Sequence, residues 1–248
     1  MKDFITALQF LTTLRVAKEE IRSTEEFAAS MRFFPLIGLL IGGILAGVGY
    51  AAGLKLSPGA VGAILLVAEI MLTGGLHLDG YMDTMDGIFS GRPRERILEI
   101  MKDSRVGAHA VIALGGLFIL KYGLLVEVAS HKAWGVLVIM PALGRFTMGI
   151  GTALFPYARP EGLGKGFAEY FTRLDLAVTL IYSGAAAVFF LGWQGILITA
   201  AVGIWGYVFS KFVTGRIGGL TGDVYGALSE LSEVIVLLCA IILPLGKW

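Results

Sequence analysis

The sequence has 248 residues, of which 56% are hydrophobic and only 16% are charged, and its formal net charge is +1. A soluble domain carries about 25% charged residues, so this chain has too little charge for a water-exposed surface. The near-zero net charge argues against nucleic acid as a partner, and the single cysteine, Cys239, excludes an intrachain disulfide. We therefore expect a lipid bilayer around the protein.

Long apolar runs predict about seven membrane-spanning helices, because roughly 20 apolar residues cross the hydrocarbon core. The predicted spans are 33–54, 59–78, 107–129, 133–153, 175–192, 194–213 and 226–246. Very short connections alternate with longer polar ones. The sequence thus predicts an all-α, polytopic membrane helix bundle that forms a single integral-membrane domain over residues 1–248, and it leaves homo-oligomerisation open.

The lysines and arginines are distributed unevenly between the two sets of connecting segments. One set holds most of them, while the opposite set holds only Lys55, Lys132 and Lys247. Because basic loops stay in the cytoplasm, we expect the N-terminus inside and the C-terminus outside, in a multi-pass protein of the cell inner membrane. An odd number of spans satisfies this arrangement.

Ahead of the first span, residues 3–15 place Phe4, Leu8, Leu11 and Leu14 on one stripe of an amphipathic helix. Two structures are compatible with this pattern. The helix lies on the membrane surface, or it packs against the bundle.

Three aspartates follow the second predicted span. Asp79, Asp83 and Asp86 have the spacing i, i+4, i+7, so on a helix they lie within about 60° of each other. Carboxylates that close repel one another and require a cation. Mg²⁺ is the expected partner, because it takes carboxylate and phosphate oxygens together. An ordinary solvated helix end is the alternative. His77, one turn earlier, is a candidate for the metal or phosphate, or is satisfied inside the bundle.

Basic residues and glycines supply candidates for phosphate binding. Lys102, Asp103 and Arg105 precede the third span, and arginine binds phosphate oxygens through a fork of donors. Arg92, Arg94 and Arg96, just upstream, are interpreted as topology signals. The segment with Arg159, Gly162 and Gly164 is a glycine-rich basic loop, of a kind that cradles phosphate with backbone N–H groups.

A second acidic stripe begins near residue 221. Thr221, Gly222 and Asp223 precede the last span, and Asp223, Glu230 and Glu233 share one helical face. Further charged residues fall inside predicted spans, where they are costly unless paired; they are Glu69, Lys121, Glu127 and Arg145. Glu69 with Lys121 or Arg145 is either an ion pair between helices or part of a polar path for a transported solute.

Taken together, these motifs resemble the cobalamin-5'-phosphate synthase family, also called adenosylcobinamide-GDP ribazoletransferases. The resemblance rests on motifs in the same chain order, covering nearly the whole sequence: Phe34–Gly38, Gly74–Gly87, Leu98–Gly107, Tyr157–Gly164 and Thr221–Glu233. It implies that adenosylcobinamide-GDP reacts with α-ribazole or its 5'-phosphate, releasing GMP. It also implies that nucleotide-activated corrinoid and α-ribazole are the partners.

For that reaction we expect Asp79, Asp83, Asp86 and Asp223 to bind Mg²⁺ and, with Asp103, to be the catalytic carboxylates. We expect the substrates to contact a set of basic, polar and glycine positions: His77, Lys102, Arg105, Arg159, Gly162, Gly164, Thr221 and Gly222. The residues do not indicate which carboxylate takes the proton.

Two other functions are weighed against this one. Asp83, Asp86 and Gly87 also resemble the opening of the CDP-alcohol phosphotransferase signature, but Ser90-Gly91 stands where that signature has Ala-Arg, and the later aspartates are absent. A transporter is the other alternative. The clustering of acids at the predicted cytoplasmic end argues against it, because transport sites lie near the midplane.

Overall fold

The computed structural model describes residues 2–18 and 23–243. Within this part of the chain the regular structure is entirely helical, as predicted. Arg22, Lys247 and the last residues of the predicted span 226–246 lie outside the described residues. The elements are α1 (Lys2–Leu11), α2 (Thr24–Ala29), η1 (Ser30–Phe33), α3 (Phe34–Gly53), α4 (Pro58–Thr73), α5 (Leu76–Phe89), α6 (Arg94–Ile100), α7 (Ala108–Ser130), α8 (Trp134–Leu154), α9 (Leu163–Tyr170), α10 (Arg173–Leu191), α11 (Gln194–Ile217) and α12 (Gly222–Ile242).

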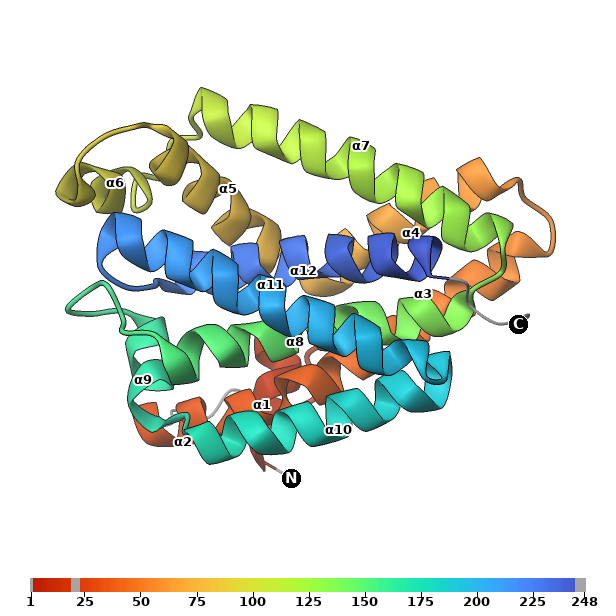
Figure 1. Cartoon of the computed structure of the whole chain (residues 1–248), viewed down its shortest axis with the longest axis horizontal. Coiled ribbons are helices and arrows are strands. Elements are labelled where there is room, and N and C mark those ends of the chain that lie inside the picture. The colour runs from red at the N-terminus through yellow and green to blue at the C-terminus, as the bar shows by residue number, and fades with distance from the viewer. Residues whose placement is uncertain (1, 19–22, 244–248) are drawn as a thin grey trace.

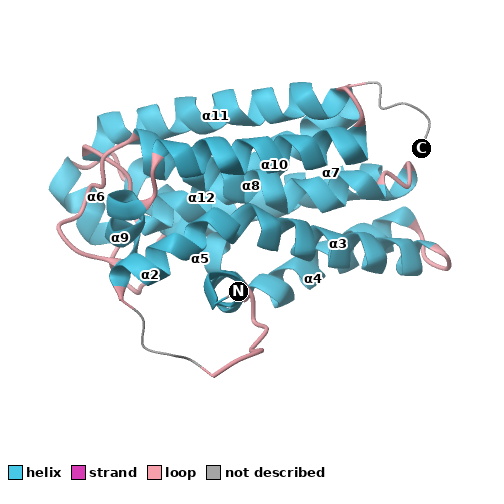
Figure 2. Ribbon diagram, turned by 90° about the horizontal axis from the view of Figure 1, so that it is seen from below, coloured by secondary structure: helices cyan, strands magenta, loops and turns pink. Residues whose placement is uncertain are grey.

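Long apolar helices run along the longest axis of the molecule (Figure 1). Six helices are long and apolar enough to cross a membrane, and a seventh crossing is made if the bent pair α4 and α5 counts as one. The short helices α2, α6 and α9 gather at one end of the bundle in both views (Figures 1 and 2). The long helices thus confirm the predicted polytopic bundle.

One predicted span differs from the structure. Residues 59–78 were expected to form a single helix, but α4 ends at Thr73 and α5 leaves at 94°. Gly74 and Gly75 have φ angles of 64° and 72°, a left-handed conformation that glycine adopts without strain. The carbonyls that the break frees on α4 accept hydrogen bonds from Thr13, which donates its backbone N–H to Leu72 (2.8 Å) and its hydroxyl to Met71 (3.1 Å). The segment after α1 therefore supplies hydrogen-bond donors to the carbonyls that the break leaves free.

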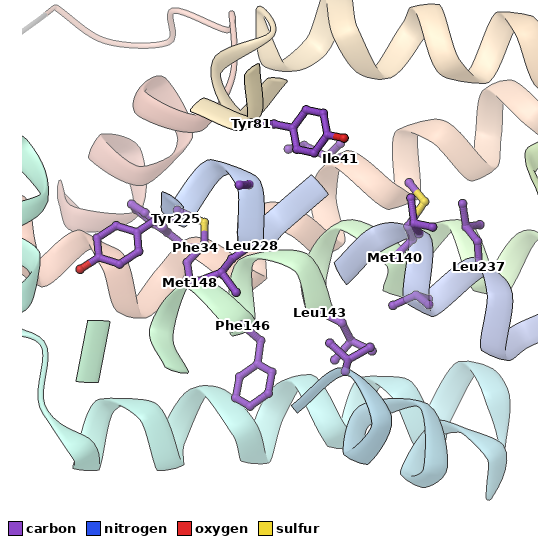
Figure 3. Close-up of a cluster of buried hydrophobic side chains, with 14 of the residues drawn as sticks. Phe34, Ile41, Tyr81, Met140, Leu143, Phe146, Met148, Tyr225, Leu228 and Leu237 are labelled. Carbon is purple, nitrogen blue, oxygen red and sulfur yellow. The ribbon is translucent and has the colours of Figure 1, made fainter. Parts of the chain in front are cut away.

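Helix α8 is the centre of the bundle, and 89% of an apolar 18-residue stretch of this helix is buried. It packs most closely against α3 and α12, and Met140 and Leu143 of α8 and Leu228 and Leu237 of α12 belong to one cluster of buried apolar side chains (Figure 3). A Cβ on Gly38 of α3 would lie 2.6 Å from the carbonyl oxygen of Pro141, so the two helix backbones are in contact there. Gly42, one turn after Gly38, meets the α8 backbone in the same way, and this spacing of small residues lets two helices approach closely.

The N-terminal amphipathic helix α1 packs on the bundle. Ala7, Leu8 and Leu11 are buried, and the Phe10 ring stacks on Phe34 at 5.7 Å between centroids. Of the predicted stripe, Leu14 lies beyond the end of α1 and is exposed. Of the two structures that the sequence left open, the packed one is observed.

Candidate active site

The three aspartates Asp79, Asp83 and Asp86 lie on α5, as the sequence predicts. Because the chain bends at Gly75, Asp79 falls in the first turn of a new helix, where the helix dipole favours a carboxylate. The sequence suggested that Asp79 lies at the end of a long membrane helix, whereas in the structure it lies at the start of a separate helix. Asp79 is exposed, while Asp83 and Asp86 are half-buried.

Helix α5 crosses the first turns of α12 at two glycines. A Cβ on Gly80 would lie 2.7 Å from the carbonyl oxygen of Asp223, and one on Gly226 would lie 2.9 Å from that of His77. The crossing places the Asp83 carboxylate within electrostatic reach of Asp79, Asp86, Asp223 and Arg159. The tertiary structure thus joins the two acidic segments that the sequence presents 140 residues apart, counting from Asp83 to Asp223.

Asp223 forms an ion pair with Arg159, whose guanidinium lies 2.7 Å from a carboxylate oxygen. The Thr221 hydroxyl donates to the same carboxylate at 3.1 Å and caps α12 by accepting the backbone N–H of Val224. Two backbone hydrogen bonds join the segments that carry these residues: Ala158 donates to Leu220 (2.7 Å), and Leu220 donates to Pro156 (2.8 Å). The loop with Arg159 is therefore fixed against the start of α12.

Arg94 on α6 stabilises this junction. Its guanidinium donates to the carbonyl of Ile217 at 2.7 Å and to that of Ala158 at 3.5 Å. The first bond satisfies a free carbonyl at the C-terminus of α11, where Gly218 adopts φ 78°. Arg94 thus has a structural contact beyond the topology signal that the sequence indicated, whereas Arg96 pairs with Glu99 at the surface.

The glycine-rich loop packs beside the same junction. A Cβ on Gly164 would lie 2.7 Å from the Tyr157 ring and 3.2 Å from the backbone nitrogen of Gly222. Gly162 has φ 128°, a conformation that strains other residues, and it approaches the Tyr157 hydroxyl. The loop therefore brings Gly162, Gly164 and Gly222 together around Tyr157, a residue that the sequence argument did not select.

Comparison with known proteins identifies the family. Residues 3–241 match the family model described as cobalamin-5-phosphate synthase. The chain belongs to the cobalamin-5-phosphate synthase family.

Curated relatives agree with that family. The chain is similar to the adenosylcobinamide-GDP ribazoletransferase of Clostridium acetobutylicum, with 41% identity over 94% of this chain and 93% of the relative. It is also similar to the proteins of that name from Roseiflexus sp. (42% identity, 93% and 86% covered) and Brevibacillus brevis (38%, 100% and 99%). No solved structure matches the chain.

In this member of the synthase family, Asp86 lies against the N-terminus of α7. A Cβ on Gly107, the N-cap residue of α7, would overlap the Asp86 carboxylate, so only glycine fits there. His109 in the next turn places Nδ1 4.0 Å from Asp86. His109 was not among the predicted site residues, although a histidine in the first turn after the Leu98–Gly107 motif was a signal that the sequence offered.

The other basic candidates lie in the loop before α7. Arg105 donates hydrogen bonds from two guanidinium nitrogens to both carboxylate oxygens of Asp103, and the closest N···O distance is 2.7 Å. These bonds hold the pKa of the Asp103 carboxyl down at about 2. Lys102 is exposed beside them. Contact of Lys102, Asp103 and Arg105 with substrate stays a prediction.

We call Asp79, Asp83 and Asp86 of α5, together with Asp223 of α12, the acidic face. His77 is buried under this face. Only 4% of it is exposed, and neither ring nitrogen has a hydrogen-bond partner. Its expected contact with substrate stays a prediction. Glu230 and Glu233, which share a helical face with Asp223, point into the interior and contact Lys121, so the stripe on α12 serves two separate clusters.

The acidic residues fit a metal that is shared with a substrate. Among the described residues, no three histidine, cysteine or acidic side chains converge closely enough to hold a metal ion by themselves. Mg²⁺, however, is commonly bound through one or two carboxylates together with phosphate oxygens and water. Asp79, Asp83 and Asp223 offer oxygen ligands around one crossing point. The arrangement therefore suits Mg²⁺ that arrives with a diphosphate.

Proposed function

We propose that this protein is a Mg²⁺-dependent adenosylcobinamide-GDP ribazoletransferase that joins the cobinamide phosphate to α-ribazole or its 5'-phosphate and releases GMP. The observation that carries the proposal is the crossing of α5 and α12, which brings Asp83 within electrostatic reach of the Asp223–Arg159 pair. The names of the curated relatives, similar over nearly the full chain, support the substrates.

The reaction replaces a phosphoanhydride bond of the diphosphate with a phosphate ester bond. A ribose hydroxyl of α-ribazole attacks the phosphorus that carries cobinamide, the bond from that phosphorus to the bridging oxygen breaks, and GMP leaves with the bridging oxygen. The hydroxyl proton passes to a carboxylate on the acidic face. When bound, Mg²⁺ supplies charge neutralisation on the diphosphate.

The residues of this chain have separate roles in that step. Asp79, Asp83 and Asp223 would hold the metal, with Asp86 beside them at the N-terminus of α7. Arg159 neutralises charge on the departing phosphate, since guanidinium groups bind phosphate oxygens with directed donors. The backbone around Gly162, Gly164 and Gly222 holds the nucleotide phosphates. Arg159 is held by its pair with Asp223, so it is oriented before substrate binds.

We infer a cytoplasmic active site in the inner membrane. The connecting segments at the end with α6 and α9 carry Arg92, Lys102, Arg105 and, on α9 itself, Lys165. The short loops at the opposite end carry only Lys55 and Lys132 as lysine or arginine among the described residues. Basic loops remain in the cytoplasm, where nucleotide substrates are made. This orientation gives the acidic face direct access to GDP-activated substrate.

The test is turnover by the purified protein in proteoliposomes with Mg²⁺, adenosylcobinamide-GDP and α-ribazole 5'-phosphate. We expect GMP release together with a corrinoid product, and we expect Asp83→Asn to abolish both while the protein still inserts into the membrane. Full activity of this variant would overturn the assignment. Release of CMP from a CDP-alcohol, without GMP release, would favour the lipid phosphotransferase alternative.

A further inference from the structure

Five ionisable side chains from four helices meet in the interior of the bundle, and we call them the buried ionic cluster. Lys121 on α7 pairs with Glu69 on α4 and with Glu230 on α12, both at 3.0 Å, and also with Glu233 on α12. Arg145 on α8 pairs with Glu233 as well. No side chain of the cluster is more than 6% exposed, so water does not screen these charges.

The cluster has unequal numbers of acids and bases. Three carboxylates face two cations, so full ionisation would leave one negative charge uncompensated in the interior of a membrane bundle. Such a charge is costly in a medium of low dielectric constant. Lys121 and Arg145 are the only buried lysine and arginine among the described residues. The nearby His77 makes no hydrogen bond to these carboxylates through either ring nitrogen.

A hydrated cation is too large to supply the missing positive charge. The cavity beside the cluster, lined by Glu69, Thr73, Lys121 and Glu230 among others, has a volume of about 10 Å³. This is at the lower limit for a single water molecule. A proton needs no such space.

The contacts indicate which carboxylate holds the proton. Glu233 is paired with both cations, which stabilise its charged form. The Glu69 and Glu233 carboxyl groups both contact the Lys121 ammonium, so they lie side by side. Unlike Glu230 and Glu233, Glu69 accepts no hydrogen bond from Lys121. In apolar surroundings, a proton on one of two adjacent carboxylates removes their repulsion. We propose that Glu69 is a neutral carboxylic acid that donates its proton to Glu233, so that the buried ionic cluster has no net charge.

This protonated contact ties together the two helices that lead to the active site. Glu69 is on α4, which continues through the bend at Gly74 into α5, and Glu233 is on α12, ten residues after Asp223. The cluster therefore fixes α4 against α12 beneath the point where α5 crosses α12. Glu69 is a positioning residue, which acts on the acidic face through these helices.

Infrared spectroscopy of the full chain in lipid nanodiscs tests the protonation state at neutral pH. We expect the wild-type protein to show the carbonyl band of a protonated carboxylic acid, Glu69→Gln to lack it, and Glu127→Gln to retain it. Glu127 is a matched control because it is a 53% exposed glutamate on α7. Absence of the band from the wild type, or its persistence in Glu69→Gln, would overturn the proposal.

Thermal unfolding supplies a second readout that does not depend on the proposed activity. Glutamine can replace a neutral acid as donor, so we expect Glu69→Gln to leave the unfolding temperature unchanged, whereas Glu233→Gln, which deprives both cations of a partner, lowers it. A rise in Glu69→Gln would mean that an excess negative charge had been removed. That rise would contradict the proposal, as would wild-type stabilisation by Na⁺ over choline that Glu69→Gln abolishes.

The positioning role has its own signature in turnover. We expect Glu69→Leu to lower kcat about tenfold, since small displacements of reacting groups slow catalysis strongly, and to leave KM for the donor unchanged. We expect Glu69→Gln to recover the rate. Equal losses in the leucine and glutamine variants would contradict positioning by a neutral hydrogen bond. If the wild type proved inactive with these substrates, the proposed function would fail while the spectroscopic result would stand.

Discussion

Arg159 and Asp223 form an ion pair of 2.7 Å between the loop that follows α8 and the first turn of α12. The pair is largely shielded, with 11% of the Arg159 side chain and 23% of the Asp223 side chain exposed. It places a cation directly beside the acids of α5. An arginine in this position can both balance the carboxylates before substrate binds and contact the diphosphate afterwards.

The first prediction concerns Arg159. Replacing it with alanine removes a directed donor for developing phosphate charge, and we expect kcat to fall by about 10². Arg159→Lys restores the charge without the fork of donors and is expected to recover part of the rate. The matched control is Lys165→Ala, on α9 just after the same loop, because Lys165 is 46% exposed and paired with Glu169. Steady-state GMP release measures all three; equal losses in Arg159→Ala and Lys165→Ala would contradict the assignment.

The second prediction concerns the metal. Removing divalent ions with a chelator is expected to stop turnover, and added Mg²⁺ is expected to restore it. Because Asp83 lies among the other acids, Asp83→Glu is expected to raise the Mg²⁺ concentration needed for half-maximal rate about 10-fold or more. Titration of the rate against free Mg²⁺ gives this value. Turnover that persists at full rate in the chelator would exclude the metal role.

The third prediction concerns the glycine crossing between α5 and α12. In Gly80→Ala the added Cβ meets the Asp223 backbone, so we expect a loss of about 1–3 kcal/mol in stability and a loss of turnover as the acids separate. Gly43→Ala on α3 is the control, because a Cβ there meets nothing within 4 Å. It is expected to be neutral or stabilising by up to about 1 kcal/mol. Denaturant unfolding in mixed micelles compares the two, and equal stabilities would contradict the close packing.

The fourth prediction concerns Lys121. Its replacement by methionine leaves buried carboxylates without their shared cation, and we expect a destabilisation of about 3–5 kcal/mol. Adding Glu230→Gln removes one of those carboxylates, so the double variant is expected to recover part of the loss. Unfolding of the single and double variants gives the coupling between the two residues. Strictly additive effects would mean that Lys121 and Glu230 do not interact.

Much of the membrane architecture follows from composition alone. Length and hydropathy of each apolar run predict α3, α7, α8, α10, α11 and α12, because a bilayer requires about 20 apolar residues with internally satisfied backbone groups. The bend after Thr73 was missed. Gly74-Gly75 permits a break, but the break is stabilised by Thr13, far away in the sequence, which donates hydrogen bonds to the freed carbonyls.

The sequence by itself determined the all-helical membrane bundle, the helical face shared by Asp79, Asp83 and Asp86, and the family motifs, since each depends on local spacing or composition. Only the tertiary structure decided which charges meet. Asp223 and Glu233 share one helical face, yet Asp223 joins Arg159 at the end of the bundle and Glu233 joins Lys121 inside it. Spacing along a helix gives the direction of a side chain, whereas its partner depends on how the helices cross, and here glycines Gly80 and Gly226 set that crossing.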